Sequence, residues 1–248
     1  MASGGPLLDE VAFLPMHLKL LLLDSAPRVA PLNDASLDAL LLEPEDIAKA
    51  DAEQGQDGLQ DGLQGWEAKD NDAELIPERQ IDRLDLSHSR ISLAMFRQVM
   101  LTETDGPGTG QPILRLPKLR SLNLSSSTLT LTASLLAILS HCPLQKLSIA
   151  GLSCNLYLPL QSIALALPTL EYLDISDSDW MNWSHLAKLD WCNLFPQLTT
   201  LRITRCEGLA PNASFQDPEG KSGGPAIIMQ AMSTVREAGR VKWLDVIA

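Results

Sequence analysis

One short pattern of alternating leucines recurs along the chain, and this repetition constrains the fold more than any other feature. Six segments carry an L-x-L-like core, and the first apolar residues of these cores are Leu84, Leu122, Leu147, Leu173, Leu201 and Leu244. The three central steps are 25, 26 and 28 residues, which is a period typical of stacked strand–helix units. The outer steps of 38 and 43 residues contain Gly- and Pro-rich insertions at 102–112 and 211–225.

Segments with helical spacing lie between these cores, so each unit is expected to contain a strand, a turn and a helix. The expected helices are 92–101, 131–140, 158–167, 184–194 and 225–238. In L-x-L the two leucines face the interior, the residue between them faces outward, and successive strands pair in parallel. One unit cannot cover its own apolar face, whereas a stack of units buries a continuous core.

These patterns resemble the leucine-rich-repeat family, in particular its longer intracellular types, over residues 80–248. In LTTLRITRCEGL, Cys206 lies three positions after the last apolar residue of the core, which is similar to the cysteine-containing repeats of F-box proteins. Ser127, Leu152 and Ser178 hold the equivalent position in other units. The resemblance implies an α/β solenoid with parallel strands on a concave face and helices on a convex face, and it implies a protein-binding function without catalysis.

The N-terminal third divides into two parts. Residues 1–45 are interpreted as a helical cap on the first repeat, with two or three short helices separated by Pro27 and Pro31. The apolar residues of one helical face are Leu14, Leu18, Leu21 and Leu22, and those of another are Leu37, Leu40 and Leu41. Residues 46–78 are acidic and poor in apolar residues, which predicts a flexible linker before the repeats of 79–248.

An alternative interpretation of the N-terminal helices comes from FLPMHLKLLLL at 13–23, which resembles the opening of an F-box. That resemblance implies the substrate-recognition subunit of a cullin-type ubiquitin ligase. Its helices would bind the ligase adaptor, and its repeats would hold the substrate. The sequence leaves this alternative open beside the cap and does not identify the partner.

The acidity of the chain is confined to its N-terminal third. Residues 1–78 carry 4 Lys and Arg against 17 Asp and Glu, whereas residues 79–248 carry 15 against 14. No basic stripe of the kind that binds phosphates is present, so nucleic-acid binding is not expected. No apolar run approaches the roughly 20 residues that span a bilayer, and no signal peptide is convincing. We therefore expect a cytoplasmic or nuclear protein without a membrane partner.

Few residues suggest chemistry. The four cysteines form no CxxC pair and have no His at metal-ligand spacing, so they are expected to be reduced and buried. Asp174, Asp177 and Asp179 could converge on calcium, but no glycine turn or downstream glutamate completes a known loop. No nucleophile has a motif that places a base beside it. We expect no enzyme, cofactor or metal, and an enzyme hidden in the insertions is the least favoured alternative.

The outward side chains of the cores are the candidate protein-binding surface, because solenoids of this kind recognise partners on the concave sheet. These candidates are Asp85, Asn123, Lys146, Ser148, Tyr172, Asp174 and Arg202. The alternative is a face that is merely solvated. Trp180 and Trp183, near Trp191, are a second candidate because tryptophan is enriched at binding hot spots. The alternative for the tryptophans is that they pack the turn and helix.

Overall fold

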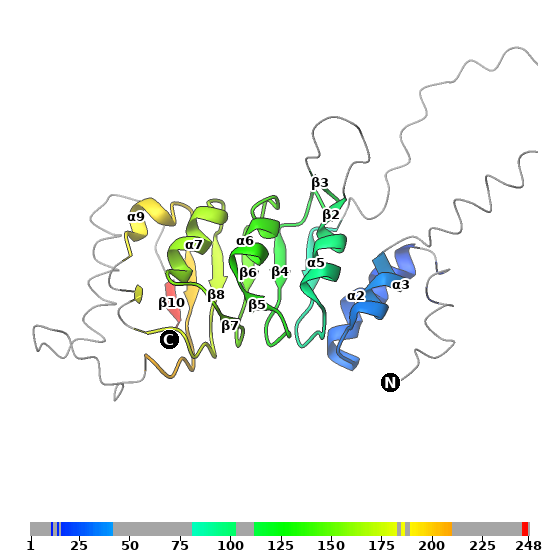
Figure 1. Ribbon diagram of the computed structural model, residues 1–248, viewed down its shortest axis with the longest axis horizontal. Helices are drawn as coiled ribbons and strands as arrows, with labels where there is room; N and C mark the ends of the chain where they lie inside the picture. The colour runs from blue at the N-terminus through cyan, green and yellow to red at the C-terminus, as the bar shows by residue number, and fades with distance from the viewer. Residues whose placement is uncertain are drawn as a thin grey trace, which may run out of the picture.

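The computed structural model describes residues 11, 14, 16–41, 81–102, 112–182, 185–186, 189–209 and 245–247. Its centre is a six-stranded parallel sheet in the order β1-β4-β6-β8-β9-β10, so its strands succeed one another across the sheet in chain order (Figure 1). The strands are β1 (Arg83–Asp85), β4 (Ser121–Asn123), β6 (Lys146–Ser148), β8 (Tyr172–Asp174), β9 (Thr200–Arg202) and β10 (Asp245–Ile247). The expected α/β class is confirmed.

Equivalent residues of successive motifs lie side by side in this sheet. Leu147 pairs with Leu122 on one side and with Leu173 on the other. The central leucines of the neighbouring strands follow the same register, since Leu84 pairs with Leu122 and Leu173 pairs with Leu201. The register predicted for the first five motifs is therefore confirmed.

The sixth motif is a correction to the sequence alignment. We aligned Leu244 with Leu201, but the structure pairs Val246 with Leu201 and Asp245 with Thr200. The pairing is thus displaced by two residues. In this segment the apolar residues Leu244 and Val246 lie two positions apart, so both face the same side of the strand. An alternating pattern of this kind shows which face of the strand is apolar, but it does not distinguish two registers that differ by two residues.

Helices α5 (Leu93–Met100), α6 (Ala133–Leu139) and α7 (Pro159–Ala166) lie along one side of the sheet, and each falls within the range predicted for it (Figure 1). Two of them begin at capping hydroxyls. The Ser92 side chain accepts a hydrogen bond from the Met95 N–H, and the Thr132 side chain accepts one from the Leu135 N–H.

The helix predicted at 184–194 is interrupted in the structure, because residues 185 and 186 are helical, residues 189 and 190 are not, and α9 then covers Trp191–Leu194. The Asp190 carboxylate accepts the Asn193 N–H and so caps a new helix at that point. The helix predicted at 225–238 lies outside the described residues.

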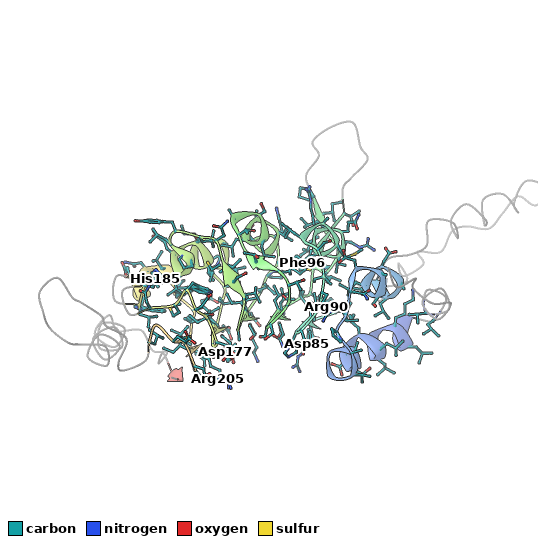
Figure 2. All side chains as sticks on the ribbon, turned by 60° about the horizontal axis from the view of Figure 1, so that its bottom comes forward. Asp85, Arg90, Phe96, Asp177, His185 and Arg205 are labelled. Carbon is teal, nitrogen blue, oxygen red and sulfur yellow. The ribbon has the colours of Figure 1, made fainter. Side chains whose placement is uncertain are left out.

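The core lies between the sheet and these helices. The central leucines of the first five strands are at most 2% exposed, and the apolar residues two positions later are buried to the same degree. Phe96 of α5 is fully buried between its helix and the sheet (Figure 2). Each such side chain contributes roughly 1.5–3 kcal/mol by leaving water, so the repeated motif is also the repeated source of stability.

Two N-terminal helices, α2 (Met16–Val29) and α3 (Asp34–Leu41), pack at the β1 end of the sheet (Figure 1). The Arg90 N–H donates to the Leu32 carbonyl at 2.6 Å, and the Ser92 N–H donates to the Asp34 carboxylate at 2.7 Å. The residues that extend the core into this region are Leu23, Leu32, Leu37, Leu40 and Leu41. This packing is what a cap on the first repeat requires.

Two details of α2 differ from the sequence expectation. The helix continues through position Pro27 to Val29, so Pro27 does not separate two helices. The apolar spacing also predicts a packed face that includes Leu18, Leu21 and Leu22, but these side chains are 38%, 65% and 40% exposed. In a segment so rich in leucine, apolar spacing alone does not show which face packs.

Two short strand pairs lie outside the main sheet. β2 (Leu101–Thr102) pairs antiparallel with β3 (Ile113–Leu114), and β5 (Thr130–Leu131) pairs parallel with β7 (Ser153–Cys154). The first pair flanks the insertion at 103–111, which, like the predicted linker at 46–78, lies outside the described residues. Within the described part of the chain, none of the helices has both the length and the apolar character needed to cross a membrane.

Candidate functional site

A groove of about 650 Å³ lies on the face of the sheet opposite the helices, which we call the open face. Strands β1, β4, β6 and β8 form its floor, and Leu23 and Asp24 of α2 line it at the β1 end. Asp85 lies on this side of the sheet, away from the helices (Figure 2). The predicted binding residues that line the groove are Asp85, Asn123, Lys146, Ser148, Tyr172 and Asp174.

The strand register arranges the outward side chains in two rows that cross the sheet. The first row is Arg83, Ser121, Lys146, Tyr172 and Thr200. The second row is Asp85, Asn123, Ser148, Asp174 and Arg202. Arg202 is exposed on β9 and lies beyond the residues that line the groove. The structure thus brings together six of the seven strand residues that the sequence indicated.

Three side chains of the second row also shape the backbone, a role that the sequence reasoning missed. Asp85, Asn123 and Asp174 each accept a hydrogen bond from the backbone N–H two residues later, at 2.9, 3.1 and 3.0 Å. These bonds turn the chain at the end of each strand. The signal was present in the sequence as Asp or Asn followed two residues later by Ser, in DLS, NLS and DIS.

Asp174 differs from the other residues of its row in burial. It is only 8% exposed, whereas Asp85 and Asn123 are half-buried. Its Oδ1 accepts the Ser176 N–H, and its Oδ2 receives no hydrogen bond from the described part of the chain. This oxygen is not among the buried polar atoms that lack a partner in the described residues, so it stays open to water and can accept a further hydrogen bond from a ligand.

The tryptophans have structural contacts. The Trp180 indole N–H donates to the Leu152 carbonyl at 3.0 Å, and the side chain is half-buried. The Trp191 indole N–H donates to the Leu186 carbonyl at 3.0 Å, and its ring stacks on Phe195 with centroids 5.6 Å apart. Trp183 lies outside the described residues. These contacts favour the interpretation that the tryptophans pack the turn and helix.

The three aspartates considered for calcium have different surroundings. Asp177 forms an ion pair with Arg205 at 2.6 Å, Asp174 accepts the bond from its own turn, and Asp179 is exposed. Among the residues whose positions are described, no group of three or more His, Cys, Asp or Glu side chains could hold a metal ion.

Three cysteines are free thiols, and the side chain of Cys192 is not described. Cys142 and Cys206 are buried, and Cys154 is half-buried, so the expectation of buried cysteines holds fully for the first two. Burial raises the pKa of the Cys142 thiol to about 12. A thiol with so high a pKa is a poor nucleophile near neutral pH, because the thiolate is the reactive form.

Comparison with known proteins gives no match, either to a protein-family model or to a curated protein.

Proposed function

We propose that this chain is a leucine-rich-repeat protein whose open sheet face, the concave face of the proposed solenoid, binds a partner protein. The observation that carries the proposal is the groove, because its floor is built from the outward residues of four consecutive strands. These are the positions that a repeat array leaves free to vary while the leucines beneath them hold the fold.

The character of the groove favours a protein segment over a small molecule. Small-molecule sites are usually enclosed and mostly apolar, with a few polar groups. This groove is lined largely by charged and hydroxyl or amide side chains and by one tyrosine, Tyr172. Its floor spans β1 to β8, which is about 14 Å at the usual strand spacing. A strip of that length and polarity suits an extended piece of polypeptide.

A substitution in the middle of the groove tests this proposal. Ser121 is half-buried on β4 and lines the groove, so Ser121→Trp should fill it without touching the core. The matched control is Ser134→Trp at an exposed position of α6, on the helical side of the sheet. In affinity purification from native extract, proteins retained by wild type and by Ser134→Trp should be lost with Ser121→Trp. Equal retention by both variants would contradict binding in the groove.

A second candidate function is favoured by the exposed leucines of α2. Leu18, Leu21 and Leu22 present apolar surface to solvent from the helix that resembles an F-box opening. We propose that this helix binds a cullin-ligase adaptor, in which case the groove would hold the ubiquitination substrate. Leu21→Asp should abolish binding to the purified adaptor, whereas Leu165→Asp, on the exposed side of α7, should not. Absence of adaptor binding by the wild-type chain would reject this candidate.

A further inference from the structure

We infer that the groove takes an extended, basic segment of its partner, with two cationic side chains about four residues apart. This inference rests on the proposed protein-binding function and adds the chemistry of the partner. Three features of the groove support it: the balance of charge along its walls, the state of Asp174, and the separation of its two acidic ends.

The charge lining the groove is predominantly negative. The four carboxylates are those of Asp24, Asp82, Asp85 and Asp174, and the two cationic side chains are Arg83 and Lys146. None of these six residues has an ion-pair partner within 4 Å among the described residues. The lining therefore carries a net negative charge, and a net charge on an interaction face attracts and orients a partner of the opposite sign.

The β8 end of the groove has the features of a cation subsite. Asp174 is more than nine-tenths buried, and its Oδ2 accepts no hydrogen bond from the described residues and stays open to water. Tyr172 lies two residues earlier on the same face of the strand, and Arg202 of β9 is the next residue of the Asp174 row. A lysine or arginine placed here would replace water at that oxygen and donate a hydrogen bond to it. The tyrosine ring beside it could interact with the same cation through its π face.

The β1 end is the second acidic site. Asp85 of β1 lies there with Asp82, and Asp24 of α2 approaches the same end. Asp85 and Asp174 lie in one cross-strand row, three strands apart, so they are separated by about 14 Å. An extended chain advances about 3.3–3.6 Å per residue, which places two cationic side chains about four residues apart.

The acidic segment of this chain is a less suitable occupant. Residues 46–78 precede β1 in the sequence, but their charge has the same sign as the groove. Repulsion disfavours their binding there. Their position in the sequence, beside the β1 end, instead adds to the long-range attraction of a basic partner.

Fluorescence anisotropy with the full chain tests the inference. The probe is fluorescein-labelled GSKGSGKSG, with two lysines four positions apart, and the comparison peptides are GSKKGSGSG and GSEGSGESG. The double variant Asp85→Asn/Asp174→Asn should weaken binding of the first peptide by about tenfold or more. The fold should be retained, because Asn123 makes the same turn with an amide oxygen at the equivalent position.

Two matched variants remove the same number of charges elsewhere. Asp38→Asn/Asp179→Asn alters exposed positions of the described chain, and Asp57→Asn/Asp61→Asn alters the acidic segment. Both should bind the probe within about twofold of wild type at moderate salt, where charges separated by more than about 10 Å are screened.

Equal binding by wild type and the groove variant, or equal binding of the three peptides, would overturn the inference. If Ser121→Trp still abolished partner capture in that case, groove binding would stand and only the basic segment would be rejected.

Discussion

Arg205 donates two hydrogen bonds to the carboxylate of Asp177, from Nε to Oδ1 and from Nη2 to Oδ2, each 2.6 Å long. The two residues hold the same position in consecutive motifs, four residues after the central leucines of β8 and β9. Both have a φ of 55°. The shared turn therefore places the two side chains side by side at the end of neighbouring strands (Figure 2).

The first prediction concerns the pH dependence of this ion pair. The hydrogen bonds from Arg205 lower the pKa of Asp177 below its ordinary value of 3.8. The pair should therefore stabilise the fold above pH 3.8, and this stabilisation should be lost as the pH falls through the lowered folded-state pKa. Asp177→Asn should lower Tm slightly at neutral pH and progressively less in acid, as measured by circular dichroism.

The effect should be small, because both side chains are largely exposed, and it should shrink at high salt. Glu207→Gln removes an exposed charge nearby and serves as the control. A Tm difference for Asp177→Asn that is independent of pH and salt would mean that the variant acts through the turn backbone and not through the ion pair.

The second prediction concerns the left-handed turn that follows the strands. His88, Ser126, Gly151, Asp177 and Arg205 all have positive φ. The N–H groups of the first four donate to carbonyls of the next unit, and that of Gly151 donates to the Ser176 carbonyl at 2.8 Å. Gly151 has a φ of 69°, and a Cβ there would lie 3.2 Å from the Ser126 Oγ.

Gly151→Ala should therefore destabilise the fold by about 1–2 kcal/mol, the usual cost of a left-handed L-residue, and crowding should add to this. Ser126→Gly removes the cost of the left-handed conformation at Ser126, but it also raises the entropy of the unfolded chain, which opposes folding. The two effects partly cancel, so this variant should be neutral or stabilising by less than about 1 kcal/mol. Urea unfolding measures both. If Ser126→Gly lowered the free energy of unfolding while Gly151→Ala left it unchanged, the result would contradict this account of the turn.

The third prediction concerns the central leucine of β6. Leu147 is fully buried between two strands that pair with its own. Leu147→Ala should cost about 2–5 kcal/mol, and Leu147→Asp should prevent cooperative folding. The adjacent Lys146 is exposed, so Lys146→Ala should change stability by less than about 0.5 kcal/mol. Thermal melts of the three variants would show the contrast, and a normal melt of Leu147→Asp would contradict the register.

The sequence was sufficient for the parts of the fold that depend on periodicity. Alternating leucines with a step of 25 to 28 residues gave the strand centres, because a buried position repeated at that interval has one consistent place in a parallel sheet. The same alternation located six residues of the groove, since the residue beside an inward leucine must face outward.

The remaining features depend on contacts that periodicity does not encode. The two-residue displacement at Val246 keeps the same face, so alternation could not exclude it. The packed face of α2 is decided by its contact with β1, which buries Leu23 and leaves Leu21 exposed. The contribution of α2 to the groove through Asp24 brings together residues far apart in the sequence. No local pattern could have indicated it.

The last prediction uses the buried thiols. With a pKa of about 12 instead of 9.0, the thiolate population of Cys142 is lowered on the order of a thousandfold at the pH of an alkylation reaction. Iodoacetamide should modify Cys142 in the native protein only slowly, and quickly after denaturation. Cys154 is half-buried and provides an internal comparison in the same molecule, although burial also raises the pKa of its thiol.

Mass spectrometry of the digested protein would follow both sites over time. Cys142 lies directly after α6, where its Sγ is 3.9 Å from the Ile138 carbonyl, so its exposure requires that end of the helix to open. Its modification should therefore accelerate in Leu147→Ala, because a less stable fold opens more often. Modification of native Cys142 as fast as Cys154, with no response to Leu147→Ala, would show that the thiol is accessible and that the helix does not cover it.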